Sequence, residues 1–327
     1  GTYNSAGIIR CDRITNEVKP LQLKLNNKEV FQPYVLKLLE RDSASLWMLT
    51  PDKLYIYYYN SNRLTVPPQP PLLNQLRGTN GYVTMAIEGD KFLWIGTSYN
   101  GIIKYDVETG NTQCYAKDEK DTAQIGSIYI QCIAVDKKNN LWYGSTRGSL
   151  LARFDATIGK SIYYDKNGNS CNESNSIQTY GIYSSGNDVY ASTNKGLLIF
   201  DISGNEFRLK RKIDSANGFA SDYIGIGGKE NDSLLWINTT NGIILYNLNS
   251  NLYDIFNRDD GLKNYANSIF SSNAGTLFVS AMNTFYEYLP NVKQNKTKAL
   301  APVLTSFKIN EDDINFNASL KNENKIT

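Results

Sequence analysis

The sequence predicts an all-β fold: a β-propeller of about seven four-stranded blades, followed by the first part of a β-sandwich. The first observation is a repeat, because Trp47, Trp94, Trp142 and Trp236 are separated by 47, 48 and 94 residues, and 94 is twice 47. The second is a composition of 23 Tyr and 24 Gly against 3 Met, which favours strands and turns. The third is the lack of convincing helical periodicity, so that repeats of 42 to 48 residues fit four-stranded blades.

The aromatic positions of the repeat continue where tryptophan is missing. Tyr190 fills the gap between Trp142 and Trp236, and Phe278 extends the series by 42 residues. A second aromatic residue follows ten to twelve residues after the first in each repeat, at Tyr57, Tyr105, Phe154, Phe200, Tyr246 and Tyr288. We expect the residues at the first position to fill the space between adjacent sheets and to be structural. They are Trp47, Trp94, Trp142, Tyr190, Trp236 and Phe278.

Each repeat is expected to contain four strands joined by tight turns, in the order shown by the repeat around Trp94. An alternating run at 82–87 precedes a polar turn and the strand that carries Trp94. The pair Asn100-Gly101 then predicts a type I′ hairpin with positive φ at both central residues, as does Asn241-Gly242 in a later repeat. After the third strand, residues 106–110 begin with an aspartate whose carboxylate is suited to accept bonds from amides two residues on. A more polar fourth strand completes the blade.

The two ends of the chain differ from the repeat. Residues 1–12 match the middle of a repeat, so the chain is expected to begin inside a blade. This half-blade completes a ring with the last repeat and gives about seven blades, unless further blades precede it. The pattern stops near residue 298, and residues 301–310 (APVLTSFKIN) begin a different β segment. We therefore expect a propeller over residues 1–298 and the incomplete start of a C-terminal β-sandwich domain over residues 299–327.

Composition excludes several classes of function. The balance of 34 Lys+Arg and 32 Asp+Glu argues against nucleic acid as a partner. The absence of histidine excludes Ser-His-Asp and Cys-His nucleophiles and His-ligated zinc. The four cysteines show no C-x-x-C spacing, which predicts no metal centre and leaves disulfides open. No stretch of 18 apolar residues predicts a membrane span, no signal peptide is recognised, and no cofactor motif is found.

The repeat resembles a known family. The pattern D-x-x-x-x-LWIGT-x-x-NG-I-x-x-YD is similar to the two-component-regulator propeller repeat of hybrid sensor proteins from gut Bacteroidetes. Residues 260–264 (DGLKN) and 217–222 (NGFASD) resemble the family's G-L-x-S-N element before the inner strand. The APVLTSFKIN segment resembles the opening of the Tyr-rich β-sandwich that follows the propellers in that family.

This resemblance implies a periplasmic ligand sensor. Members commonly contain two seven-bladed propellers, the sandwich, a membrane helix, and then kinase and regulator domains, and many sense oligosaccharides. The chain then corresponds to the second propeller plus a stub of the sandwich. It is expected to be non-catalytic itself, within a parent sensor histidine kinase, to contact the adjoining propeller and sandwich, and to form a homodimer in the full-length protein, with no membrane contact by this segment. Tyr190, Phe278, Leu49, Ser192 and residues 51–53 depart from the family pattern.

Candidate ligand-binding residues are expected on one face of the propeller, where the loops joining strands two and three meet the segments that enter each blade. Aromatic faces with amide and guanidinium donors suit an oligosaccharide, and Arg147 suits an acidic sugar. The loops contribute Tyr3, Asn4, Tyr99, Asn100, Arg147, Asn194, Lys195, Asn241 and Asn283; the entry segments contribute Tyr129, Gln178, Tyr180, Tyr223, Tyr265 and Asn267. The alternative interpretation is that the Asn residues form positive-φ turns and the Tyr residues pack between blades.

Two other functions stay open. A propeller enzyme acting on glycans, as a lyase or hydrolase, would need acidic groups at the loop face, but Glu88, Asp90 and Asp136 precede Trp strands in recurring turns and favour a turn role. A protein-interaction scaffold is the other alternative. The basic run at 208–212 is expected on an outer strand, where charge discourages edge-to-edge pairing.

Overall fold

The protein is an all-β propeller in the computed structural model. The structure describes residues 8–12, 15, 17–30, 34–51, 53–68, 81–116, 125–127, 129–147, 150–155, 158–171, 177–204, 207–215, 224–262, 266–271, 276–281, 284–288, 308–309 and 312–313. The chain divides into two compact units, Gly1–Leu289 and Pro290–Thr327. In the second unit the described elements are the paired strands β29 (Lys308–Ile309) and β30 (Asp312–Asp313).

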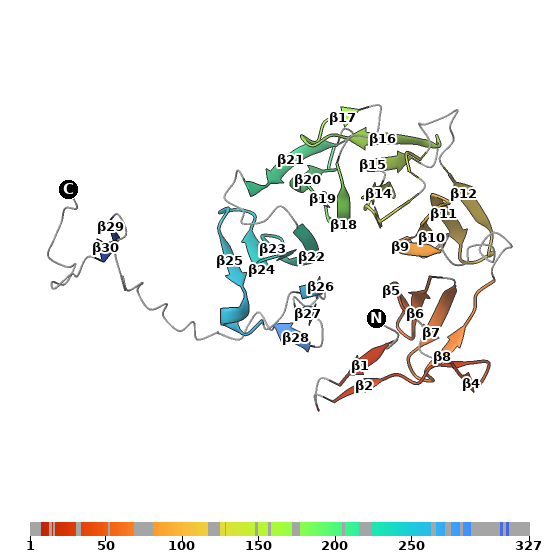
Figure 1. The fold of residues 1–327 in the computed structure, drawn as a ribbon. Helices are drawn as coiled ribbons and strands as arrows, with labels where there is room; N and C mark the ends of the chain where they lie inside the picture. Colours follow the sequence, from red (N-terminus) through yellow and green to blue (C-terminus); the bar gives the residue numbers. More distant parts are fainter. Residues whose placement is uncertain are drawn as a thin grey trace. The chain divides into compact units, whose positions relative to one another are not determined.

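The first unit contains six antiparallel blades within its described residues (Figure 1). Blade 1 has β5 (Lys37–Asp42), β6 (Ser45–Leu49), β7 (Leu54–Tyr58) and β8 (Arg63–Thr65); blade 2 has β9 (Tyr82–Glu88), β10 (Phe92–Thr97), β11 (Ile102–Asp106) and β12 (Thr112–Tyr115); blade 3 has β13 (Cys132–Val135), β14 (Leu141–Ser145), β15 (Leu150–Asp155) and β16 (Lys160–Tyr164). Blade 4 has β18 (Thr179–Ser185), β19 (Asp188–Thr193), β20 (Gly196–Asp201) and β21 (Arg208–Ile213); blade 5 has β22 (Ile224–Asn231), β23 (Leu234–Thr239), β24 (Gly242–Asn247) and β25 (Tyr253–Phe256); blade 6 has β26 (Ala266–Ser271), β27 (Leu277–Ala281) and β28 (Thr284–Tyr288).

Shorter elements extend this plan. The strands β3 (Lys24–Leu25) and β4 (Lys28–Glu29) extend the outer edge of blade 1, and β17 (Ser170–Cys171) extends blade 3. A separate hairpin of β1 (Ile9–Cys11) and β2 (Val18–Pro20) precedes blade 1. The single described helix is a 3₁₀ turn, η3 (Arg258–Asp260).

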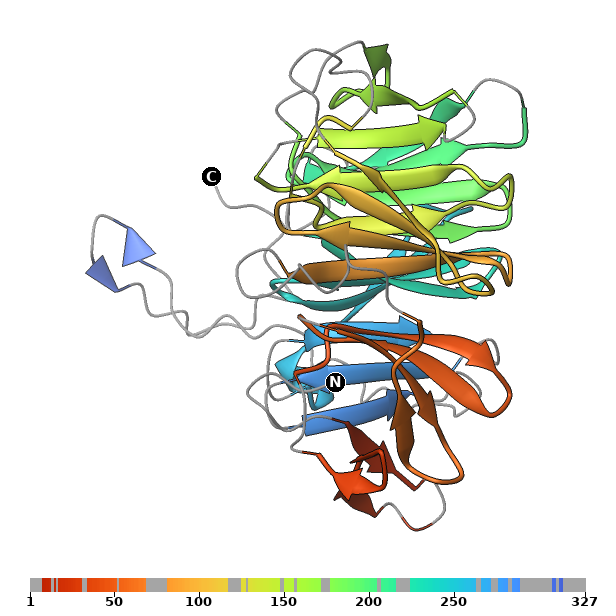
Figure 2. The same ribbon diagram turned by 90° about the vertical axis from the view of Figure 1, so that its right-hand side faces the viewer.

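Consecutive blades contact each other through their first strands. β5 contacts β9, β9 contacts β13, β13 contacts β18, β18 contacts β22, and β22 contacts β26. These first strands therefore surround the axis of the propeller, while the fourth strands lie outside (Figure 1). The side view shows the strands of blades 2 to 4 in successive layers (Figure 2). The basic run at 208–212 lies on the outer strand β21, as predicted.

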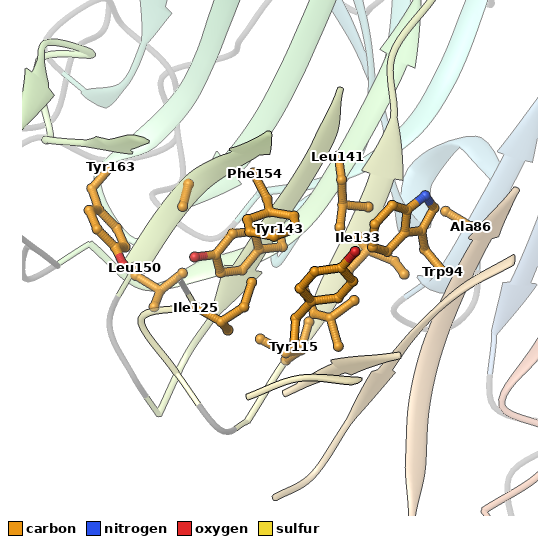
Figure 3. Packing of buried hydrophobic residues seen from close by; sticks show 13 residues of the cluster. Ala86, Trp94, Tyr115, Ile125, Ile133, Leu141, Tyr143, Leu150, Phe154 and Tyr163 are labelled. Carbon is orange, nitrogen blue, oxygen red and sulfur yellow. The ribbon is translucent and has the colours of Figure 1, made fainter. Parts of the chain in front are cut away.

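The two aromatic positions of the repeat meet across the blade interfaces. The ring of Trp94 lies 6.3 Å from that of Phe154 in the next blade (Figure 3). The same contact joins Trp47 to Tyr105 at 6.4 Å, Trp142 to Phe200 at 5.3 Å, and Trp236 to Tyr288 at 5.0 Å. The tryptophans are at most 2% exposed and Tyr190 is fully buried. In blades 1, 2, 3 and 5 the first aromatic residue is therefore buried against the second aromatic residue of the next blade.

In blades 1, 2, 4 and 5, a threonine three residues after the first aromatic position closes the turn between strands two and three. The Thr97 hydroxyl donates to the carbonyl of Gly101 at 3.0 Å and accepts from the N–H of Asn100 at 2.8 Å. Thr50, Thr193 and Thr239 make the same pair of bonds in blades 1, 4 and 5. We call this arrangement the threonine clamp. The hydroxyl pairs an N–H of the turn, and in blades 1 and 2 it adds a second donor to a carbonyl that already accepts from the threonine's own N–H.

The prediction of type I′ turns at the two Asn-Gly pairs is wrong. At these turns φ is positive at Gly101 (69°) and Gly242 (138°), and the preceding Asn100 and Asn241 keep negative φ. The threonine clamp explains this, because it holds the N–H of each asparagine from inside the turn. The glycine is needed for a second reason: a Cβ on Gly101, Gly196 or Gly242 would lie 2.3 to 2.4 Å from a carbonyl oxygen of the outer strand.

We predict that Gly196→Ala destabilises the propeller far more than Gly186→Ala. Gly186 has a φ of 59° but nothing lies within 4 Å of an added Cβ, so its substitution costs about 1 kcal/mol. Gly196 has a φ of 103°, and its Cβ would also overlap the Ile213 carbonyl oxygen at 2.4 Å, so we expect a cost above about 2 kcal/mol. Urea midpoints of both variants measure the difference. Equal shifts of the two midpoints would contradict the close approach.

Candidate ligand-binding face

The loops between strands two and three meet the segments that enter each blade. In blade 4 the N–H of Asn194 donates to the carbonyl of Gln178 at 2.9 Å, and the N–H of Gln178 donates to Oδ1 of Asn194 at 3.0 Å. In blade 2 the N–H of Ser98 donates to the carbonyl of Gly81 at 3.0 Å. The entry of blade 3 is joined to the loop of blade 2, because the N–H of Ile130 donates to the Thr97 carbonyl at 3.0 Å. These bonds hold the loop and the entry segment together within blades 2 and 4, and they join the loop of blade 2 to the entry of blade 3.

Arg147 and Tyr129 meet on this face. The guanidinium carbon of Arg147, in the loop after β14, lies 4.7 Å from the ring centroid of Tyr129, in the segment before β13. The Tyr129 hydroxyl donates to Oε1 of Gln131 at 2.7 Å. Arg147 is exposed, and its guanidinium has no carboxylate partner among the described residues. The ring holds the cation in place while its N–H donors stay open to a ligand.

Other predicted residues fall into two groups. Tyr99 is 42% exposed on the loop of blade 2, and Lys195 is exposed on the loop of blade 4, so both present their side chains to solvent. Asn194 instead uses its side chain to cap Gln178, and the N–H groups of Asn100 and Asn241 belong to threonine clamps. The turn interpretation of these asparagines is therefore supported by their bonds, although not by positive φ.

Of the remaining predicted residues, the structure describes Tyr180 and Asn267. Tyr180 donates its hydroxyl to Oε1 of Gln178 at 3.3 Å. Asn267 belongs to β26. Tyr3, Asn4, Tyr223, Tyr265 and Asn283 lie outside the described residues.

The first strands carry a second layer of residues directly below the loop face. Each member pairs with the residue two positions after a first aromatic residue: Lys37 with Leu49, Thr84 with Gly96, Cys132 with Gly144, Gly181 with Ser192, Gly225 with Asn238, and Ser268 with Ser280. We call these six first-strand residues the axial ring. Lys37 is its one charged member. Lys37 lies opposite Leu49, which stands where the repeats around Trp94 and Trp142 have glycine.

The carboxylates near the tryptophans are engaged in local structure. Oδ1 of Asp136 accepts from the N–H groups of Lys138 and Asn140 at 2.8 and 3.0 Å, as the predicted turn role requires. Oδ2 of Asp136 also accepts from Nε1 of the buried Trp142 at 2.9 Å. Glu88 departs from the turn prediction, because it lies in β9 and its carboxylate accepts from Nε1 of Trp94 at 2.6 Å.

Glu88 also pairs with Lys104 at 3.1 Å. The Asp106 turn forms as predicted, and the N–H groups of Thr109 and Glu108 hold the pKa of its carboxyl below the usual value. Across the described residues, no group of three or more Cys, Asp or Glu side chains is placed to hold a metal ion. Within that same part of the chain, no helix is long and apolar enough to cross a membrane.

The chain is similar in sequence to a histidine kinase and in fold to an extracellular domain of a putative hybrid two-component system. No protein-family model matches the sequence. The chain is 20% identical over 304 residues to Histidine kinase P4 of Formosa agariphila, which covers 90% of this chain and 22% of that protein. It shares its fold with the extracellular domain of the putative hybrid two-component system BT3049 from B. thetaiotaomicron, with a TM-score of 0.55 and 18% identity over 76% of this chain and 32% of that one.

The same fold occurs in streptogramin B lyase, with a TM-score of 0.60 and 16% identity over 86% of each chain. The chain thus spans about a fifth of the curated kinase and about a third of the BT3049 domain. The predicted resemblance to the extracytoplasmic region of hybrid two-component sensors is confirmed by the kinase and BT3049 likenesses.

We predict that a thiol-reactive reagent distinguishes the cysteines of the native chain. Cys114 is an exposed free thiol, whereas Cys132 is buried in the axial ring, and burial raises the pKa of its thiol to about 12. At pH 8, Cys114 should therefore react with iodoacetamide at least tenfold faster than Cys132, as measured by peptide mass spectrometry. Denaturant should remove the difference. Fast native labelling of Cys132 would show that the first strands leave it accessible.

Proposed function

We propose that this chain is part of the extracytoplasmic ligand-sensing region of a hybrid two-component histidine kinase and response regulator, and that it binds an oligosaccharide in the periplasm. The likeness to a histidine kinase over 90% of the chain supports this placement. So does the fold shared with an extracellular domain of a hybrid two-component system. In this proposal the segment is not itself an enzyme, and the kinase belongs to another part of the longer protein.

The observation that carries the proposal is the loop face of blades 2 to 4. It combines the exposed ring of Tyr99, the stacked pair of Arg147 and Tyr129, and the exposed ammonium of Lys195. Sugar rings stack their C–H faces on aromatic side chains, and their hydroxyl and acidic groups take directional bonds from amide and guanidinium donors. The remaining predicted residues, Tyr3, Asn4, Asn100, Asn194, Tyr223, Asn241 and Tyr265, are proposed as the surroundings of this site.

Signalling in this proposal requires a ligand that distinguishes two arrangements of the longer protein. A ligand shifts such an equilibrium only by the difference in its affinity for the two states. We propose that the oligosaccharide changes how this propeller contacts an adjoining propeller and the β-sandwich that begins near residue 299, across a homodimer.

We also propose that the full propeller has seven blades, with the hairpin β1–β2 as the outer half of the seventh. Residues flanking this hairpin, Ile8 and Leu21, pack with Met48 on the free side of blade 1. At the other end of the described blades, Phe278 occupies the first aromatic position and stacks on Phe270 at 6.4 Å, and Phe270 is 62% exposed. An aromatic face of this kind is buried by the next blade in blades 1 to 5.

Because the chain shares its fold with streptogramin B lyase, an enzyme is the second candidate function. The chain contains no histidine, and the carboxylates Asp136 and Glu88 are committed to the tryptophans and turns. A lyase or hydrolase acting on glycans would release product from the bound oligosaccharide. A protein-interaction scaffold would bind a partner protein and no oligosaccharide.

We predict that Arg147→Gln and Tyr99→Ala each weaken oligosaccharide binding by about tenfold or more, because each removes a charged donor or a stacking face. Isothermal titration against a library of plant and host glycan fragments, followed by chromatography of the mixtures, measures both affinity and turnover. Lys28→Gln, on β4, is the matched control. Unchanged affinity in both variants would remove this site, and steady product formation would favour the enzyme.

We predict that Phe270→Ser costs less than about 0.5 kcal/mol in this chain, because its ring is largely exposed. In a chain extended before Gly1, where two further strands would complete the seventh blade, the same substitution should cost about 3 kcal/mol. Thermal and urea unfolding of the four proteins measure the contrast. A small cost in both backgrounds would contradict a seventh blade next to blade 6.

A further inference from the structure

Gln131 is joined to Arg147 through the side chain of Tyr129. The guanidinium carbon of Arg147 lies 4.7 Å from the ring centroid of Tyr129, and the hydroxyl of the same ring donates to Oε1 of Gln131 at 2.7 Å. Both contacts lie within blade 3, between the segment that enters β13 and the loop that follows β14. We call Arg147, Tyr129 and Gln131 the blade 3 triad.

A β-bulge sets the position of Gln131. Its N–H donates to the carbonyl of Gly144 at 2.9 Å, and Gly144 is also the strand partner of Cys132. Two consecutive residues therefore oppose one residue of β14, which is the arrangement of a β-bulge. Blades 2 and 4 have a shift of register at the corresponding place in their first strands. Bulges redirect a side chain, and in blade 3 the additional residue is a glutamine that meets Tyr129.

Tyr129 and Gln131 are directed away from the core. Ile130 lies between them and is fully buried, and a Cβ added to Gly96 of blade 2 would lie 2.9 Å from the Ile130 side chain. The N–H of Ile130 is held by the Thr97 carbonyl at 3.0 Å. The side chains on either side of this anchor, Tyr129 and Gln131, are partly exposed. Burial of the central residue thus turns its two neighbours toward solvent.

The blade 3 triad offers hydrogen-bond donors to a ligand. Because Oε1 of Gln131 accepts from Tyr129, the part of the amide that stays available is its nitrogen with two N–H donors. No described residue bonds to this nitrogen, and it is not buried. Arg147 is exposed and has no carboxylate partner among the described residues. A guanidinium and an amide nitrogen donate and do not accept, so they favour ligand groups that are rich in acceptors.

We infer that Arg147 and Gln131 form a subsite for one acidic sugar unit. Arg147 binds the carboxylate or sulfate group through two parallel N–H donors, and Gln131 donates to a second oxygen of the same unit. Because the side chain of Tyr129 separates the two donors, they are spaced for two groups of one sugar and not for two oxygens of one carboxylate. The inference rests on the proposed function in placing the ligand on the loop face, and it adds a ligand class and Gln131.

Arg63 is a second arginine that stacks on a tyrosine in this chain. Its guanidinium carbon lies 5.0 Å from the ring centroid of Tyr58, and Arg63 is exposed on the outer strand β8. Within the part of the chain that the structure describes, no glutamine is bonded to the Tyr58 hydroxyl. A difference in behaviour between Arg147 and Arg63 therefore reports the blade 3 triad and not stacked arginines in general.

The reactivity of Arg147 toward phenylglyoxal, which modifies guanidinium groups, tests the subsite in the intact chain. Rates are measured by peptide mass spectrometry in glucuronate, glucose 6-sulfate, methyl glucoside, or sodium chloride at matched ionic strength. We expect at least one of the two acidic sugars to slow modification of Arg147 by about fivefold or more, with methyl glucoside and chloride without effect. Protection by only one acidic sugar would identify the acidic group. Equal rates at Arg147 in all four solutions, or equal slowing at Arg63, would overturn the subsite.

Gln131→Glu separates a binding role of Gln131 from a structural one. Glutamate keeps an oxygen that accepts from Tyr129 and replaces the amide donors with a charged acceptor. The melting temperature should therefore stay within about 2 °C of the parent. The concentration of acidic sugar that protects half of Arg147 should rise about tenfold or more. Gln113→Glu, on the exposed face of the outer strand β12, is the matched control and should leave protection unchanged. Unchanged protection in Gln131→Glu would refute the role of Gln131.

Arg147→Lys provides a second variant at an exposed position. Lysine keeps the charge but lacks the paired donors, so glucuronate or glucose 6-sulfate, whichever protects Arg147, should bind about tenfold more weakly in isothermal titration. Equal affinity of the two proteins would contradict two-point binding by Arg147.

Failure of the subsite and failure of the proposed function give different results. Protection of Arg147 by an acidic sugar, without binding of any oligosaccharide, would support the subsite and refute the proposed function. Binding of neutral oligosaccharides, without protection of Arg147 by either acidic sugar, would refute the subsite and support the proposed function.

Discussion

Burial of one aromatic ring beneath the next blade is the interaction on which the rest of the structure depends. Trp94 contacts Tyr115 of its own sheet at 5.7 Å, and Phe154 of the following blade completes its burial at 6.3 Å. The same pairing joins Trp142 to Phe200. Because blades 1 to 5 each bury this face against the next blade, their stability is a sum of nearest-neighbour interfaces, as in other repeat proteins. The position of each ring along its strand also determines where the following loop begins. The packing of the core therefore determines where the loop face lies.

The sequence was sufficient for the features that depend on spacing. Ring positions recur at the blade period, so the tryptophans identified the propeller, and aspartate turns such as that of Asp106 followed from local chemistry. The Asn-Gly turns were predicted wrongly, because the hydroxyl of Thr97 competes for the N–H of Asn100. The bond from Nε1 of Trp94 to Glu88 was also missed, because it depends on the pairing of β9 with β10 and not on a local turn pattern.

The loop face separates two kinds of residue that look alike in sequence. Oδ1 of Asn194 accepts a hydrogen bond from the N–H of Gln178. Asn194 therefore stabilises the loop face, and this oxygen is not available to a ligand. Arg147 is supported from below by Tyr129 and leaves its donors free. Turn geometry and recognition thus come from different side chains of the same loops. Only bonding partners, and not residue types, distinguish them.

The threonine clamp has an evolutionary consequence. It closes the turns of four blades with one hydroxyl each, and in blades 2 and 4 the clamped segments run from Thr97 to Gly101 and from Thr193 to Gly196. Inside these segments Asn194 uses its side chain to hold Gln178, whereas Tyr99 and Lys195 present their side chains to solvent. Inner positions such as Tyr99 and Lys195 are therefore free to diversify without disturbing the sheets. When such a blade is duplicated, its strands and turns stay the same, and its loop residues can change to recognise a different group.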